Sequence, residues 1–216
     1  MKISRQDERS RFWRDTVGKI PHDYNRIPLK YLRCLNARDV LEIGPGNGRH
    51  TQDIKKQCKG YDVADIDQKI VSDFADRADN GHLITDYASA VGKYDAILAW
   101  FVMHHITSGE LGDFLAFLKI NLRPGGEIVI NTPCDYRIYQ GDAIKDDGMH
   151  TTERELADVI EALRDVGFDV TDEMAQSGDS YIICARLKPA VSKPLPATRK
   201  ITKKLDGKTP RPNPEV

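Results

Sequence analysis

The chain has 216 residues, a formal net charge of −1 and 40% hydrophobic residues, values typical of one globular domain and unlike those of a disordered chain. No apolar run approaches the roughly 20 residues needed to cross a bilayer, and the charged first residues lack an apolar signal-peptide core. We therefore expect no membrane partner and a cytoplasmic location. The four cysteines are scattered without a Cys-x-x-Cys pair, so we interpret them as reduced packing residues.

Periodicity predicts the order of helices and strands. Two short helices come first, over residues 4–18 and 28–36, so we interpret residues 1–37 as an N-terminal helical cap. Apolar runs then predict strands near residues 39–43, 61–65, 82–85, 94–100, 126–131, 168–174 and 179–187. Helices are expected between them, over about 48–58, 68–77, 109–121 and 153–166. The last helix is expected to begin with a capping box of Thr152 and Glu155.

The alternation of these elements predicts the fold. Strands that alternate with helices form a parallel sheet with right-handed crossovers. The segment from Tyr87 to Lys93 leaves little room for a helix between the third and fourth strands. The last two strands are joined by a turn, so they are expected to pair as an antiparallel hairpin at one edge. We predict an α/β fold with a seven-stranded, mostly parallel sheet and helices on both faces.

Three closely spaced glycines follow the first strand, in the segment Val40-Leu-Glu-Ile-Gly-Pro-Gly-Asn-Gly48. Glycine tolerates a positive φ and lets backbone N–H groups approach a ligand at a helix N-terminus, so this turn predicts a nucleotide-like ligand. A dinucleotide-binding turn has a third glycine or alanine five residues after the first, where this chain has Arg49. No Gly-Lys-Ser/Thr follows either, which argues against the phosphate-binding loop of nucleotide hydrolases.

The acidic Glu42 ahead of Gly-x-Gly-x-Gly resembles motif I of the class I S-adenosylmethionine-dependent methyltransferases. Later segments resemble that family in the same order: carboxylates after the second strand, an acid closing the third, two histidines after the fourth and a Pro-Gly-Gly turn before the fifth. The resemblance extends roughly over residues 38–131. It implies a Rossmann-like methyltransferase domain over residues 38–187. It also implies an enzyme that uses S-adenosyl-L-methionine and releases S-adenosyl-L-homocysteine.

The resemblance also implies roles for single residues. Asp65 is expected to bind the ribose hydroxyls, while Asp67 competes for this role or instead caps the following helix. Asp86 is expected to meet the adenine amino group, with a turn-forming role as its alternative. Trp100 is expected either to line the ligand crevice or to pack in the core. The predicted cofactor site comprises Glu42, Gly44, Gly46, Gly48, Asp65, Ile66, Asp86, Tyr87 and Trp100.

Three histidines are candidates for a general base, because histidine exchanges protons near neutral pH. His104 and His105 follow the fourth strand, at the edge where open α/β sheets bind ligands, and His150 precedes the last helix. The alternative is that each caps or packs a helix. We predict no metal site, although several aspartates between residues 131 and 150 keep metal binding open.

The acceptor is predicted to be a small molecule, methylated on oxygen, carbon or nitrogen. The loop after the fourth strand lacks the Asn/Asp-Pro-Pro-aromatic motif of enzymes that methylate nucleic-acid or glutamine nitrogens. Segment 131–150, with one arginine and two tyrosines, is expected to form the acceptor wall and suits an anionic or aromatic molecule. A non-catalytic scaffold protein that binds S-adenosylmethionine is an alternative, and a nicotinamide dehydrogenase is disfavoured by Arg49.

Charge distinguishes the end of the chain. Residues 188–216 carry eight basic and two acidic side chains, six of the eleven prolines and no aromatic residue. Such a segment cannot bury enough apolar surface to fold alone, so we expect a disordered basic tail. Its simplest interpretation is a solubilising extension. The alternative is that a nucleic-acid or protein methyltransferase uses it as an electrostatic handle.

Overall fold

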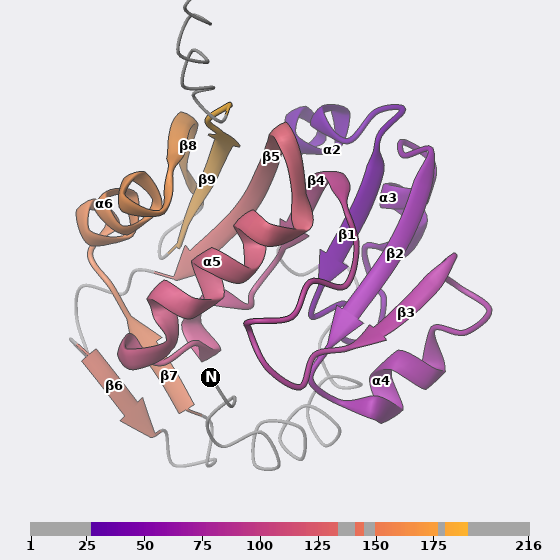
Figure 1. Cartoon of the computed structure of the whole chain (residues 1–216), viewed down its shortest axis with the longest axis horizontal. Coiled ribbons are helices and arrows are strands. Elements are labelled where there is room, and N and C mark those ends of the chain that lie inside the picture. Colours follow the sequence, from indigo (N-terminus) through magenta and orange to yellow (C-terminus); the bar gives the residue numbers. More distant parts are fainter. Residues whose placement is uncertain (1–26, 134–140, 145–149, 177–179, 190–216) are drawn as a thin grey trace, which may run out of the picture.

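The computed structural model describes residues 27–133, 141–144, 150–176 and 180–189 (Figure 1). One sheet has the strand order β3-β2-β1-β4-β5-β9-β8. Its strands are β1 (Asp39–Ile43), β2 (Gly60–Asp65), β3 (Asn80–Leu83), β4 (Tyr94–Ala99), β5 (Leu122–Pro133), β8 (Phe168–Gln176) and β9 (Ser180–Leu187). The helices are α2 (Leu29–Cys34), α3 (Thr51–Lys55), α4 (Gln68–Asp73), α5 (Leu111–Asn121) and α6 (Leu156–Val166). Two single turns of 3₁₀ helix are η2 (Met103–His105) and η3 (Ser108–Glu110).

The predicted fold class is confirmed. Strands β1 to β5 pair in parallel, whereas β9 runs antiparallel between β5 and β8. The predicted hairpin therefore forms with β8 at the edge of the sheet. The expected lack of a helix between β3 and β4 is also confirmed, since residues 84–93 contain none. The N-terminal helix at 4–18 and the tail beyond residue 189 lie outside the described residues.

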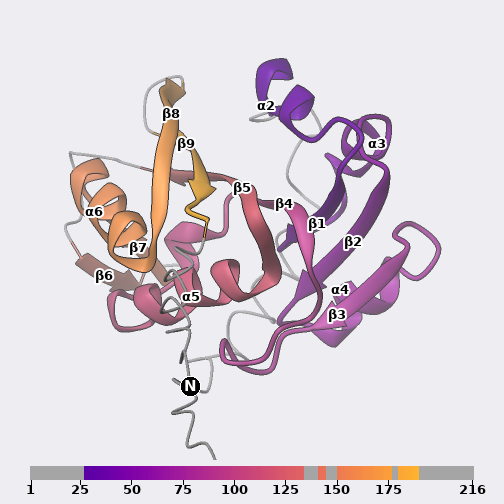
Figure 2. The same ribbon diagram turned by 45° about the horizontal axis from the view of Figure 1, so that its top comes forward.

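Helices cover both faces of the sheet (Figures 1 and 2). Along β1, Val40 and Leu41 point to opposite faces, as successive strand residues do, and both are fully buried. Val40 belongs to a cluster with α2, α3 and α4, through Tyr31, Ile54 and Ile70. Leu41 belongs to a cluster with α5 and α6, through residues that include Phe114, Leu118 and Leu163. Burial on both faces explains the continuous apolar runs of the central strands.

The predicted capping box at Thr152 is wrong. Helix α6 begins at Leu156, and the side chain of its N-cap residue, Glu155, forms no capping hydrogen bond. Thr152 is still part of a strand, because β7 (His150–Glu153) pairs with β6 (Gly141–Ile144) in a second, two-stranded sheet. No pattern in the sequence predicted this second sheet. A capping box does form elsewhere, between Thr107 and Glu110 ahead of α5.

The bounds of several elements differ from the prediction. Helices α3 and α4 end three and four residues early, and β3 lies two residues before its predicted position. Strand β5 starts at Leu122 rather than near residue 126, and its pairing with β4 shifts register between Tyr94 and Ala96. In the described part of the chain, no helix has the length and apolar character that crossing a membrane requires.

Candidate functional site

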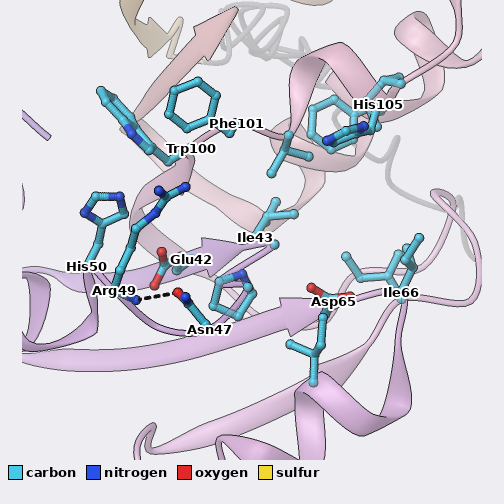
Figure 3. Close-up of a pocket in the computed structure, with 18 of the residues that line it drawn as sticks. Glu42, Ile43, Asn47, Arg49, His50, Asp65, Ile66, Trp100, Phe101 and His105 are labelled. Carbon is cyan, nitrogen blue, oxygen red and sulfur yellow. Dashed lines mark hydrogen bonds between the residues drawn. The ribbon is translucent and has the colours of Figure 1, made fainter. Parts of the chain in front are cut away.

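A pocket that is partly open to solvent lies at the carboxyl ends of β1, β2 and β4. This is the edge at which open α/β sheets bind ligands. Figure 3 shows its two sides: Asp65 and Ile66 lie on one side, and Arg49, His50 and Trp100 lie on the other. The pocket thus joins residues that follow three different strands.

The glycine loop between β1 and α3 has the backbone that the sequence predicted. Gly44, Gly46 and Gly48 have φ values of 65°, 58° and 78°, in the left-handed region that favours glycine. A Cβ on Gly44 would lie 2.7 Å from Cγ2 of Val102, and one on Gly48 would lie 1.7 Å from Nη2 of Arg77. Gly44 and Gly46 line the pocket, whereas Gly48 packs behind it.

Arg77, a residue that sequence reasoning missed, fixes this loop from behind. Its Nη2 donates to the carbonyl oxygens of Asn47 and Gly48, at 3.1 and 3.2 Å. Its guanidinium also lies over the ring of Phe74, 4.3 Å from the centroid. No local motif marks Arg77, because its role depends on packing against a loop about 30 residues earlier in the chain.

Glu42 ends β1 as a buried carboxyl group at the pocket, with 2% of the residue exposed. The hydroxyl of Tyr61 donates to it from the neighbouring strand. Burial raises the pKa of Glu42 to about 7, against the opposing effects of the Tyr61 hydrogen bond and of the Arg77 and Arg49 charges. A ligand cation would offset the loss of hydration and favour the ionised form.

Asp65, which the resemblance favoured for the ribose role, and Asp67, its competitor, have different surroundings. Asp65 lines the pocket, and burial raises its pKa to about 7 although the backbone N–H of Asp67 donates to it at 2.8 Å. The side chain of Asp67 accepts from the backbone N–H of Lys69 at 2.8 Å and caps α4. The alternative that Asp67 caps the next helix is therefore confirmed, and Asp65 is the acid of this pair that lines the pocket.

Asp86 does not line the pocket. Its carboxylate accepts the backbone N–H groups of Ala88 and Ser89, at 2.8 and 3.0 Å, and these hydrogen bonds hold its pKa below the usual range. The next residue, Tyr87, does line the pocket and packs edge-on against Phe114 at 5.6 Å between ring centroids. Ile66 also lines it. Of the predicted cofactor residues, Gly48 and Asp86 lie outside the pocket lining.

The segment after β4 forms the other side. Trp100 and His105 line the pocket, whereas Met103 is fully buried in the core. His104 is buried next to His105, with ring centroids 3.8 Å apart, but does not line the pocket. The sequence placed both histidines after β4 and could not tell which of them faces the ligand.

Arg154, the residue directly after β7, fixes η2. Its Nη1 donates to the carbonyl oxygen of Met103 at 3.0 Å, and its Nη2 donates to that of Ile106. Strand β7, which begins at His150, lies beside η2. The side chain of His150 lies outside the described part of the structure. Sequence reasoning missed Arg154, which is about 50 residues from η2.

The described residues contain no group of three or more His, Cys, Asp or Glu that could hold a metal ion. Asp135, Asp146 and Asp147 of the predicted acceptor segment lie outside the described ranges, as do its tyrosines and its arginine. The lack of a metal site and the acceptor wall therefore stay predictions.

Comparisons with known proteins agree with this geometry. A model of the methyltransferase domain matches residues 8–173. A tRNA U34 carboxymethyltransferase of Pseudoalteromonas translucida (strain TAC 125) is 30% identical over 128 residues, which make up 55% of this chain and 38% of that protein. A probable S-adenosylmethionine-dependent methyltransferase of Mycolicibacterium smegmatis (strain ATCC 700084 / mc(2)155) is 27% identical over 146 residues, 66% of this chain and 56% of that protein. The matches thus span between about two fifths and just over half of these relatives.

Among solved structures, the DhpI complex with S-adenosylhomocysteine matches with a TM-score of 0.65 and 16% sequence identity, over 85% of this chain and 97% of that one. At this identity the likeness concerns the fold. The family match extends over most of the sequence. It confirms the resemblance to the methyltransferases that motif I indicated. The complex with S-adenosylhomocysteine supports S-adenosylmethionine as the cofactor. The chain belongs to the methyltransferase-domain family and has the fold of the class I S-adenosylmethionine-dependent methyltransferases.

Proposed function

We propose that this chain transfers the methyl group of S-adenosylmethionine to a small-molecule acceptor bound over the end of β4. The observation that carries the proposal is the two-sided pocket. Two buried carboxyl groups, Glu42 and Asp65, lie at the ends of β1 and β2. The aromatic and basic residues after β4 face them across the same cavity (Figure 3).

The residues of the first side fit the cofactor. A buried carboxyl group such as Asp65 suits a pair of ribose hydroxyls, and a second one, Glu42, suits the ammonium group of the methionine portion. Both have a pKa raised to about 7 by burial, as expected for acids that await a ligand donor or cation. Ile66 and Tyr87 offer apolar surface for the adenine. The positive φ of Gly44 favours glycine, which has no side chain, so the backbone of this loop can lie close to the ligand.

The second side would supply positioning and proton transfer. When bound, S-adenosylmethionine supplies a methyl group already activated by a sulfonium, so an acceptor atom held close and in line is the main requirement. His105 is the candidate base, because it is the histidine of the η2 pair that lines the pocket. Its imidazole would take the proton that the methylated molecule releases during the transfer. His104 and Arg154 would hold η2 in place behind it.

Calorimetric titration tests the cofactor half of the proposal. The full-length chain is expected to bind S-adenosylmethionine and S-adenosylhomocysteine and to ignore NADH. A lack of adenosyl binding would refute it. Binding followed by no production of S-adenosylhomocysteine across a broad panel of hydroxyl, amine and carbon-acid acceptors would favour the non-catalytic scaffold protein instead.

A tRNA acceptor is the second candidate, favoured by the name of one relative and by the basic residues of segment 188–216. It predicts that tRNA affinity falls steeply with salt, with a slope of roughly −0.7 per phosphate contact on single strands, and is lost when residues 190–216 are removed. A tail in which glutamine replaces the basic residues is the matched control for charge. Salt-independent or absent tRNA binding would remove this candidate.

A further inference from the structure

Tyr61 is a buried tyrosine one hydrogen bond away from the pocket. It lies in β2 with 1% of the residue exposed, and it packs in the apolar cluster that α2, α3 and α4 form on one face of the sheet. A phenylalanine would fill the same space without taking a hydroxyl out of water. Tyr61 does not line the pocket, so its hydroxyl can act on a ligand only through a neighbouring side chain.

Within the described residues, the hydroxyl of Tyr61 has two buried partners. It donates to Oε2 of Glu42 in β1, and Oγ1 of Thr51, the first residue of α3, lies 3.3 Å from it. Because a hydroxyl has one proton and Tyr61 donates it to Glu42, Thr51 is the donor in the second hydrogen bond. The two bonds form a chain from α3 through β2 to the carboxyl group of Glu42.

The surroundings of Tyr61 keep its hydroxyl a donor. Burial, and after it the charge of Glu42, raises the pKa of Tyr61 far above its usual value, so the phenol keeps its proton near neutral pH. A hydrogen bond from a neutral phenol to a carboxyl group favours the ionised form of that group. In agreement, the bond from Tyr61 opposes the burial that raises the pKa of Glu42 to about 7.

Two arginines also act on Glu42. Arg49 lies beside it in Figure 3, and Arg77 bonds the glycine loop from behind. Their charges favour ionised Glu42 as well, and both effects are smaller than that of the Tyr61 hydrogen bond. The other titratable side chains of the pocket lining are His50, Asp65, Tyr87 and His105. The hydrogen bond from Tyr61 is thus the main contact that favours a carboxylate at position 42.

We infer that Tyr61 is a positioning residue of the cofactor site, which holds Glu42 as an oriented carboxylate for the ammonium group of the methionine portion. A carboxylate has about four lone-pair sites, so Glu42 can accept from Tyr61 and from a ligand ammonium at the same time. Thr51 fixes the direction of the Tyr61 hydroxyl. This inference rests on the proposed function, because that proposal assigns Glu42 to the ammonium group.

Two adenosyl ligands separate this role from a purely structural one. S-adenosylhomocysteine carries the ammonium group, whereas 5′-methylthioadenosine has the same adenine, ribose and thioether but lacks the amino-acid portion. By calorimetry near pH 7, Tyr61→Phe is expected to weaken S-adenosylhomocysteine about tenfold and to leave 5′-methylthioadenosine within about twofold of wild type. Retained binding of the second ligand also shows that the variant is folded. Equal losses for both ligands, or no loss for either, would overturn the inference.

The pH dependence of binding is a readout that lost packing would not move. Without the bond from Tyr61, Glu42 ionises at a higher pH, so the loss of S-adenosylhomocysteine affinity in Tyr61→Phe should be largest near about pH 6 and nearly absent near about pH 9. The ratio of variant to wild-type affinity removes the titration of Asp65 and of the ligand, which both proteins share. A ratio that stays constant over this range would refute the role of Tyr61.

Glu42 and a second tyrosine supply the controls. In a Glu42→Gln background, where no carboxylate is left to orient, Tyr61→Phe should cause no further loss of S-adenosylhomocysteine affinity. Tyr94→Phe is the matched control, because the hydroxyl of Tyr94 donates to Asp62 at 2.7 Å and neither residue lines the pocket. It should leave both ligands within about twofold of wild type. A further tenfold loss in the first case, or a tenfold loss in Tyr94→Phe, would overturn the inference.

Affinity for S-adenosylhomocysteine separates the two proposals. If the wild-type protein binds neither this ligand nor S-adenosylmethionine, the proposed function itself fails. If the wild-type protein binds S-adenosylhomocysteine and Glu42→Gln binds it equally tightly, Glu42 does not meet the ammonium group. The role of Tyr61 is then refuted, while the proposed function stands.

Discussion

The two sides of the pocket are held by different segments of the chain. On the cofactor side, the hydroxyl of Tyr61 donates to Glu42, the backbone N–H of Asp67 donates to Asp65, and Arg77 donates to the glycine loop. These residues all lie within about 35 residues of one another. On the acceptor side, Phe101 is held from β5, and η2 is held by Arg154, about 50 residues later. The contacts of the first side thus come from β1, β2 and the residues up to Arg77, and those of the second side come from β5 and the residue after β7. Because the two sets share no residue, we expect that one side can change without rebuilding the other.

The largest effect expected on the cofactor side comes from Gly48→Val. It combines a φ of 78° with a Cβ placed 1.7 Å from Nη2 of Arg77, so the unfolding free energy should fall by about 4 kcal/mol. Urea denaturation measures this loss. Gly125→Val is the matched control, because Gly125 has a φ of 77° and no atom within 4 Å of its would-be Cβ. Equal losses would show that backbone strain alone matters and that Arg77 is a bystander.

The raised pKa values of Glu42 and Asp65 predict a pH dependence of the cofactor side. Both groups bind a proton in the folded, ligand-free protein up to about pH 7, whereas in the unfolded chain they lose it near pH 4. Between these values the folded state binds more protons, so the unfolding free energy falls as pH rises, by about 3 kcal/mol for a shift of Glu42 from 4.5 to about 7.

Thermal denaturation from pH 4 to 8 measures this fall, and Glu42→Gln is expected to flatten it. Bound S-adenosylhomocysteine should oppose it, because an ammonium group favours the ionised carboxylate. A Tm that does not change with pH in the ligand-free protein would contradict the assignment of burial as the dominant effect.

Asp65→Ala tests the cofactor side without disturbing the other. We expect S-adenosylmethionine affinity to fall by about 1–3 kcal/mol, since buried ribose hydroxyls lose an acceptor, as measured by calorimetry. Asp86→Ala is the informative comparison. An equal loss would show that Asp86 reaches the adenine, as its place in the sequence predicts, and a much smaller loss would assign it to the turn with Ala88 and Ser89.

Arg154→Met gives the smallest effect and tests whether the two sides are independent. It removes two bonds to the backbone of η2, so the unfolding free energy should fall by about 1–2 kcal/mol while cofactor affinity is unchanged. Arg164→Met, on the exposed face of α6, is the control. A loss of S-adenosylhomocysteine affinity in Arg154→Met alone would show that the two sides are coupled.

The contacts that hold the two sides of the pocket also explain what could be predicted from the sequence. Motif I and the alternation of apolar runs are short patterns, and they predict the glycine backbone and the fold class correctly. The αL conformation of Phe101, with a φ of 57°, depends on a hydrogen bond from its backbone N–H to Asn131 of β5, and no local pattern encodes such a pair. The capping box at Thr152 failed for the same reason, because pairing of β7 with β6 overrides a local helix signal.

The contact between Gly44 and Val102 limits how the pocket can diversify. A methyl group on Gly44 would meet Cγ2 of Val102 at 2.7 Å, so the cofactor loop and the acceptor loop share one close-packed joint. A larger side chain at position 102 would push on the loop that binds the donor. Phe101, one residue earlier, lines the pocket, and none of its atoms lies within 4 Å of a Cβ built on Gly44. If the acceptor binds over the end of β4, as we propose, we expect changes in specificity to be tolerated better at Phe101 than at Val102.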